Sequence, residues 1–126
     1  MMSLVGGRIT THVLDTSKGV PAAGVRVELY VLHRDGEKES KRKVAESVTN
    51  GDGRLEAPLL EGGKLEKAVY ELQFNVEGYY AQRSFEELGQ ALWTMVPIRF
   101  SVSDAASHYH IPLLIAPGGY STYRGS

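Results

Sequence analysis

Two histidines and an arginine are the side chains of this sequence best suited to catalysis: His12, His110 and Arg54. A neutral imidazole can accept or donate a proton near pH 7. A guanidinium group can hold a planar or anionic, oxygen-rich group through two parallel hydrogen bonds. A site that combines the three residues suits hydrolysis without a covalent intermediate.

Two other interpretations of these residues are open. His108 and His110 stand two positions apart and share a face if their segment is a strand, so together with His12 they could bind zinc. No aspartate or glutamate stands at an obvious ligand spacing from them, and we expect no metal. The histidines could also satisfy backbone groups only, with Arg54 as a surface corner residue. Spacing alone does not decide between these roles.

The histidines lie in segments whose patterns predict strands. Residues 9–14 alternate in polarity and place His12 on the less apolar face. In residues 108–113 the alternation puts His108 and His110 on the face opposite the apolar side chains. Each segment therefore offers one face to a core and the other to chemistry.

Turns position the other candidate residues. The Asn-Gly-Asp-Gly run at 50–53 is a strong turn signal and places Arg54 at a rigid corner. The Pro-Gly-Gly run at 117–119 predicts a tight reversal. We therefore expect residues 120–123 to return alongside the histidine strand, so that the tail folds over the histidine face.

The rest of the chain predicts an all-β fold. Strands are expected at 25–32, 44–49, 69–76 and 96–102, with a turn or loop at 15–23 and one short helix at 84–92 that begins with a capping box. The charge-dense loop at 34–43 is interpreted as a solvated hairpin connection. Seven to eight strands and one helix indicate an antiparallel two-sheet sandwich. The expected buried core comprises Val25, Val27, Leu29, Leu72, Phe74, Ile98, Phe100, Ile111 and Leu113.

Length and composition limit the alternatives. The 126 residues fit a single domain, which we place at 8–126 after a flexible N-terminus at 1–7. A net charge of −1 gives no field to attract nucleic acid or an anionic membrane. The absence of cysteine excludes disulfides and thiolate chemistry. The sequence lacks a signal-peptide pattern and any apolar run of about 18 residues, so we expect a soluble, cytoplasmic protein.

Five motifs resemble those of the 5-hydroxyisourate hydrolases, the transthyretin-like enzymes of purine catabolism. They are T-T-H-V-L-D at 10–15, G-V-P-A at 19–22, T-N-G-D-G-R at 49–54, H-Y-H-I-P-L-L at 108–114 and Y-S-T-Y-R-G-S at 120–126. The resemblance spans residues 8–126, and Tyr-Arg-Gly-Ser is its most specific motif. The segments 116–119 and 77–95 depart from the family's usual pattern.

The resemblance implies a transthyretin-like sandwich and a homotetramer built as a dimer of dimers. It also implies the cofactor-independent hydrolysis of 5-hydroxyisourate to 2-oxo-4-hydroxy-4-carboxy-5-ureidoimidazoline. His12, Arg54 and His110 take the catalytic roles, and Tyr123 and Ser126 join His12 and Arg54 in binding the substrate. His12 is the hypothetical general base, with His110 setting its proton state, although the assignment of base and acid between the two histidines stays open.

Two rival functions remain. One is a transthyretin-like protein that binds a small molecule without hydrolysing it. At the positions of His12, Arg54 and His110, however, the transthyretin hormone carriers have lysine, glutamate and threonine, so this sequence sides with the enzyme. The other is a zinc-dependent hydrolase of a different substrate.

Overall fold

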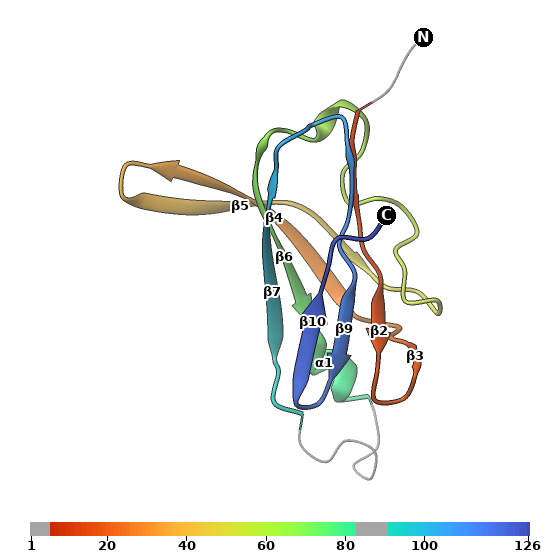
Figure 1. Cartoon of the computed structure of the whole chain (residues 1–126). Coiled ribbons are helices and arrows are strands. Elements are labelled where there is room, and N and C mark those ends of the chain that lie inside the picture. The colour runs from red at the N-terminus through yellow and green to blue at the C-terminus, as the bar shows by residue number, and fades with distance from the viewer. Residues whose placement is uncertain (1–5, 83–90) are drawn as a thin grey trace.

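The computed structural model describes residues 6–82 and 91–126, and these form a β-sandwich (Figure 1). Its elements are β1 (Arg8–Thr10), β2 (Val13–Asp15), β3 (Val20–Pro21), β4 (Arg26–Asp35), β5 (Lys38–Val48), a 3-10 helix η1 (Gly62–Lys64), β6 (Ala68–Asn75), α1 (Val76–Tyr80), β7 (Met95–Val102), β8 (His108–His110), β9 (Leu113–Ala116) and β10 (Gly119–Thr122). The all-β prediction is confirmed.

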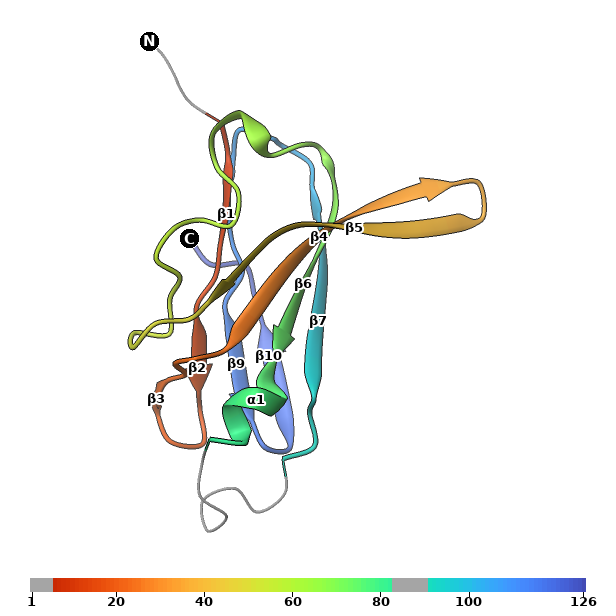
Figure 2. The same cartoon turned by 180° about the vertical axis from the view of Figure 1, so that it is seen from behind.

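Two four-stranded sheets make up most of the sandwich. One has the order β10-β9-β2-β3 and the other the order β5-β4-β6-β7, while β1 and β8 form a separate pair. Figure 2 shows β1 leading down into β2 along one side of the molecule. The pairs β1–β8 and β2–β9 are parallel, whereas the other ladders are antiparallel. The strands predicted at 9–14 and 108–113 are each interrupted and form two shorter strands. For this reason the described residues contain ten strands and not the predicted seven to eight.

The core lies between the sheets and contains most of the expected residues. Val25, Val27, Leu29, Leu72, Phe74 and Leu113 are fully buried, and Ile111 is nearly so. Ile98 and Phe100 are only partly buried and pack against the core. The prediction was wrong for these two because β7 is an edge strand of its sheet in the described part of the chain.

The hairpin predicted at the charge-dense segment 34–43 is confirmed, but the segment is not a loop. Strands β4 and β5 continue through it, and the turn between them contains only Gly36 and Glu37. Gly36 has φ of 65°, a left-handed conformation that glycine adopts without steric penalty. Arg34 pairs with Glu39 on the opposite strand at 3.1 Å. Opposite charges therefore face each other along a long hairpin that projects from the sandwich (Figure 1).

The helical prediction at 84–92 lies largely outside the described residues, and its last two positions, 91 and 92, are not helical. The structure instead has α1 directly after β6, where the sequence predicted that the strand would run on to Val76. The Asn75 side chain caps this helix by accepting a hydrogen bond from the backbone N–H of Gly78. The helix buries Val76, Tyr79 and Tyr80 against the core. Within the described residues, no helix is both long and apolar enough to cross a membrane.

Candidate active site

The structure brings the three predicted catalytic residues together. Nδ1 of His12 and Nε2 of His110 lie 2.8 Å apart, within hydrogen-bonding distance. Arg54 pairs with His12 through an isolated antiparallel β-bridge. The turn at 50–53 forms as predicted and presents Arg54 at its end. The two histidines are 98 positions apart in the sequence. His12 lies between β1 and β2, His110 is the last residue of β8, and they meet because β1 and β8 run parallel.

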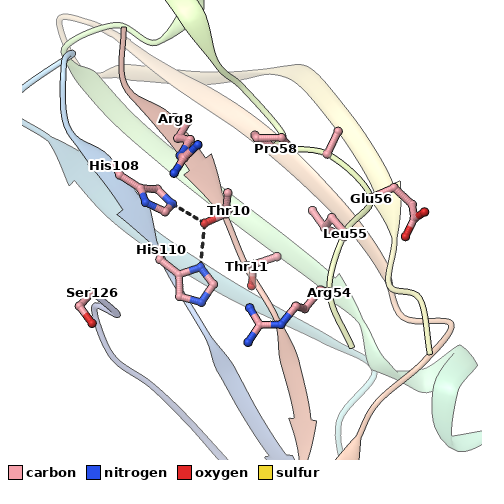
Figure 3. A pocket seen from close by; sticks show the side chains of 11 residues that line it. Arg8, Thr10, Thr11, Arg54, Leu55, Glu56, Pro58, His108, His110 and Ser126 are labelled. Atoms are coloured by element: carbon pink, nitrogen blue, oxygen red, sulfur yellow. Dashed lines mark hydrogen bonds between the residues drawn. The ribbon is translucent and has the colours of Figure 1, made fainter. Parts of the chain in front are cut away.

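Two further residues extend this pair. The hydroxyl of Thr10 lies 2.7 Å from Nδ1 of His110 and 2.6 Å from Nε2 of His108 (Figure 3). Thr10 stands directly opposite His110 in the β1–β8 ladder. His12, His110, Thr10 and His108 therefore form one continuous hydrogen-bonded chain. Sequence reasoning considered His108 but missed Thr10, whose only signal was its place on the same strand face as His12.

A pocket of about 310 Å³ opens beside this chain of side chains. His110, His108 and Arg54 line it, together with Arg8 and Ser126. Figure 3 shows the Arg54 side chain reaching toward His110 from the opposite wall. The lining thus presents imidazole and guanidinium groups to one small space, which suits a planar ligand rich in oxygen and nitrogen.

Two of the predicted binding residues are not part of the pocket lining. Among the described residues that line the pocket, His12 and Tyr123 are not found. His12 is half-buried and adjoins the pocket through its contacts with His110 and Arg54. Tyr123 is 54% exposed. The structure therefore groups Ser126 and Arg54 as pocket-lining residues and leaves Tyr123 at the surface.

The tail folds over the histidine strand, as its turn signal predicted. β10 runs antiparallel to β9 after the turn at Pro117 and Gly118. The backbone N–H of Gly125 donates to the carbonyl of His110 at 2.7 Å. Arg124 donates to the carbonyl of His108 at 3.2 Å, and its guanidinium group lies 4.4 Å from the centre of the Tyr109 ring. These contacts fix the tail against both histidines of β8.

The surroundings keep the central histidines neutral. Burial, followed by the proximity of His12, His108 and Arg54, lowers the pKa of His110 to about 4. Burial and the positive charge of Arg54 also lower the pKa of His12. At neutral pH both imidazoles therefore have a nitrogen that can accept a proton. In the described part of the chain, no group of three or more His, Asp or Glu side chains is arranged to hold a metal ion.

Comparisons with known proteins show what this chain is similar to. The model of the HIUase/Transthyretin family matches residues 9–125. A 5-hydroxyisourate hydrolase from Halalkalibacterium halodurans is 51% identical over 122 residues, covering 97% of this chain and 100% of that protein. The structure of Klebsiella pneumoniae 5-hydroxyisourate hydrolase matches with a TM-score of 0.71 and 36% identity, over 95% of this chain and 94% of that chain. Sea bream transthyretin in complex with thyroxine matches with a TM-score of 0.79 over 94% of each chain, but at 22% identity the likeness concerns the fold alone.

Proposed function

The chain belongs to the HIUase/transthyretin family, and from this membership and the pocket chemistry we infer that it is a 5-hydroxyisourate hydrolase of urate catabolism. The observation that carries the inference is the hydrogen bond between His12 and His110 beside Arg54. A neutral imidazole pair next to a guanidinium group supplies a base for water and a positive charge for the developing oxyanion. The product is 2-oxo-4-hydroxy-4-carboxy-5-ureidoimidazoline.

In the proposed mechanism His12 is the general base. Both ring nitrogens of His110 are engaged, Nδ1 with Thr10 and Nε2 with His12. The Nδ1 of His12 is engaged with His110, so the Nε2 of His12 is the nitrogen of this pair that is left for the attacking water. This arrangement favours His12 over His110 as the residue that takes the proton.

Arg54 binds the substrate oxygens and stabilises the negative charge that forms on the attacked carbonyl. Among the described residues, no carboxylate lies within ion-pair distance of Arg54, so its charge is available to a ligand. Ser126 lies on the pocket wall and positions the substrate or the water. Tyr123 belongs to this binding set through the family resemblance.

The proposal includes assembly as a homotetramer, a dimer of dimers, in the cytoplasm. Two features support assembly. In the described part of the chain, β7 and β10 are edge strands, and unpaired edges readily accept a strand from another copy. Met95 on β7 and Tyr120 on β10 are each 42% exposed, which is apolar surface that an interface would cover. Light scattering after size-exclusion chromatography measures the assembly directly.

The test of the activity is to generate 5-hydroxyisourate from urate with uricase and to follow its ultraviolet decay with and without the protein. We expect the protein to accelerate the decay and Arg54→Ala to remove most of the acceleration. The rival function, a transthyretin-like binding protein, predicts saturable binding with no acceleration. That result with a correctly folded protein would refute the hydrolase.

A further inference from the structure

The hydrogen-bonded chain of the active site does not end at the catalytic pair. We propose that Thr10 and His108 form the outer half of a proton relay, which passes the proton that His12 takes from water through His110 to His108 at the protein surface, and returns a proton to His12 when the leaving nitrogen is protonated. This inference rests on the proposed function, because it assigns a path to the proton that His12 takes from water.

The geometry provides three consecutive short links. The distances are 2.8 Å from His12 to His110, 2.7 Å from His110 to Thr10 and 2.6 Å from Thr10 to His108. All three fall in the normal range for hydrogen bonds. The parallel register of β1 and β8 fixes the links, since it sets Thr10 opposite His110.

One arrangement of protons satisfies every link. His12 donates its Nδ1–H to Nε2 of His110, His110 donates its Nδ1–H to the Thr10 oxygen, and the Thr10 hydroxyl donates to Nε2 of His108. In this arrangement Nε2 of His12 carries a free lone pair. When a proton binds there, each shared proton moves one acceptor along. His108 then becomes the imidazolium, and His12 is left neutral with its proton on Nε2. When His12 gives that proton to the leaving nitrogen, each shared proton moves back by one link, His108 becomes neutral and Nε2 of His12 regains its lone pair.

The reaction requires such a relay. Hydrolysis breaks the amide C–N bond of the ring and forms a C–O bond with the oxygen of water. The leaving nitrogen takes one proton and becomes part of a ureido group, which is not basic enough to take a second. The new carboxylic acid ionises at neutral pH. One proton of the water therefore ends on the leaving nitrogen, and the other is released when the acid ionises. His12 must pass on the proton that it takes from water and then supply the one that the leaving nitrogen needs.

The two ends of the relay differ in the way that a proton acceptor at the surface needs. His110 is half-buried, whereas His108 is exposed and can exchange protons with water. Arg8 faces His108 from β1, and Arg124 faces it from the tail. Burial and these two positive charges lower the pKa of His108, so it gives the proton up again instead of retaining it. The low pKa of His110, about 4, likewise prevents the proton from resting in the middle of the chain.

The decisive comparison is between Thr10→Val and Thr10→Ser. Valine keeps the shape of threonine but removes the hydroxyl, whereas serine keeps the hydroxyl. We expect Thr10→Val to lower kcat by about tenfold or more in dilute buffer, because a proton-transfer step then lacks its partner. Thr10→Ser should recover most of that loss. Raising the concentration of imidazole buffer should also restore kcat in Thr10→Val, because the buffer removes the proton directly, while wild-type kcat should stay independent of buffer.

His108→Gln provides a second variant that does not depend on the first. Its side chain is exposed, so the fold should tolerate the change, and kcat should show the same loss and the same rescue by buffer. Wild-type kcat in both variants in dilute buffer would overturn the relay. A loss of kcat that no buffer restores would overturn it as well and would assign these residues a structural role. If the wild-type protein itself failed to accelerate 5-hydroxyisourate decay, the proposed function would be at fault and not the relay.

Discussion

Gly125 in the tail offers a sharp test of the site, because its neighbour leaves no room for a side chain. A Cβ atom added at Gly125 would lie 2.6 Å from Cδ2 of His110, which is 0.8 Å less than the 3.4 Å at which ordinary van der Waals contact begins. In Gly125→Ala either the tail must lift, losing the 2.7 Å hydrogen bond to the His110 carbonyl, or the ring must move away from His12. A misplacement of about 1 Å can lower a rate about a hundredfold, so we expect a loss of kcat/KM of that order.

The assay is the ultraviolet decay of 5-hydroxyisourate, with circular dichroism and size-exclusion chromatography to confirm the fold and the assembly. Gly118→Ala is the matched control: it lies in the same tail, a Cβ there would meet nothing within 4 Å, and its φ is not positive. We expect Gly118→Ala to keep wild-type kcat/KM. Equal activity in Gly125→Ala and wild type would refute the view that the tail holds the histidine in its working position.

Four other predictions follow from the same structure. His12→Asn, His110→Asn and Arg54→Ala should each lower kcat by roughly a hundredfold or more without a change in circular dichroism, as acid-base and electrostatic roles require; near wild-type turnover would make that residue structural. Removal of residues 123–126 should leave the fold intact but abolish most hydrolysis, whereas unchanged turnover would make the tail a passive terminus. Leu29→Ala should lower the free energy of unfolding by about 2 to 5 kcal/mol, seen as a lower melting temperature, because Leu29 is fully buried. The melting temperature should also fall as pH drops from 6.5 to about 4, because the unfolded chain protonates His110 in that window while the folded chain resists, and His110→Asn should weaken this dependence.

The core and the turns could be predicted because their signals are local. The alternation of apolar and polar residues over 25–32 indicates which side chains are buried, and Val27 and Leu29 are buried in the structure as expected. The Asn-Gly-Asp-Gly turn is likewise encoded by neighbouring residues, since glycine tolerates the positive φ of 73° found at Gly53. Edge position is not local, so the partial exposure of Ile98 could not be read from a pattern that resembles a buried strand.

The long charged hairpin shows a second limit of predicting structure from this sequence. A run of charged residues ordinarily indicates a solvated loop, because isolated charges gain little from extended structure. Here, however, charged residues find partners on neighbouring strands. Arg34 on β4 meets Glu39 on β5, and in the same sheet Arg99 on β7 reaches Glu71 on β6 at 3.0 Å. Glu71 is only 4% exposed and also lies 3.1 Å from Lys41 on β5. These pairs depend on strand register, which charge content does not reveal.

The active site contains three residues that could be predicted from the sequence and one that could not. His12, His110 and Arg54 could be identified from the sequence because each residue type has its own chemistry and belongs to a recognisable motif. Thr10 could not, because threonine is common in strands and acquires its role only from the residue opposite it. That residue is His110, 100 positions away, and a register shift of one residue would turn the Thr10 hydroxyl to the other face of the sheet. The β1–β8 ladder therefore determines whether the histidine side chains are isolated from one another or belong to one connected proton path.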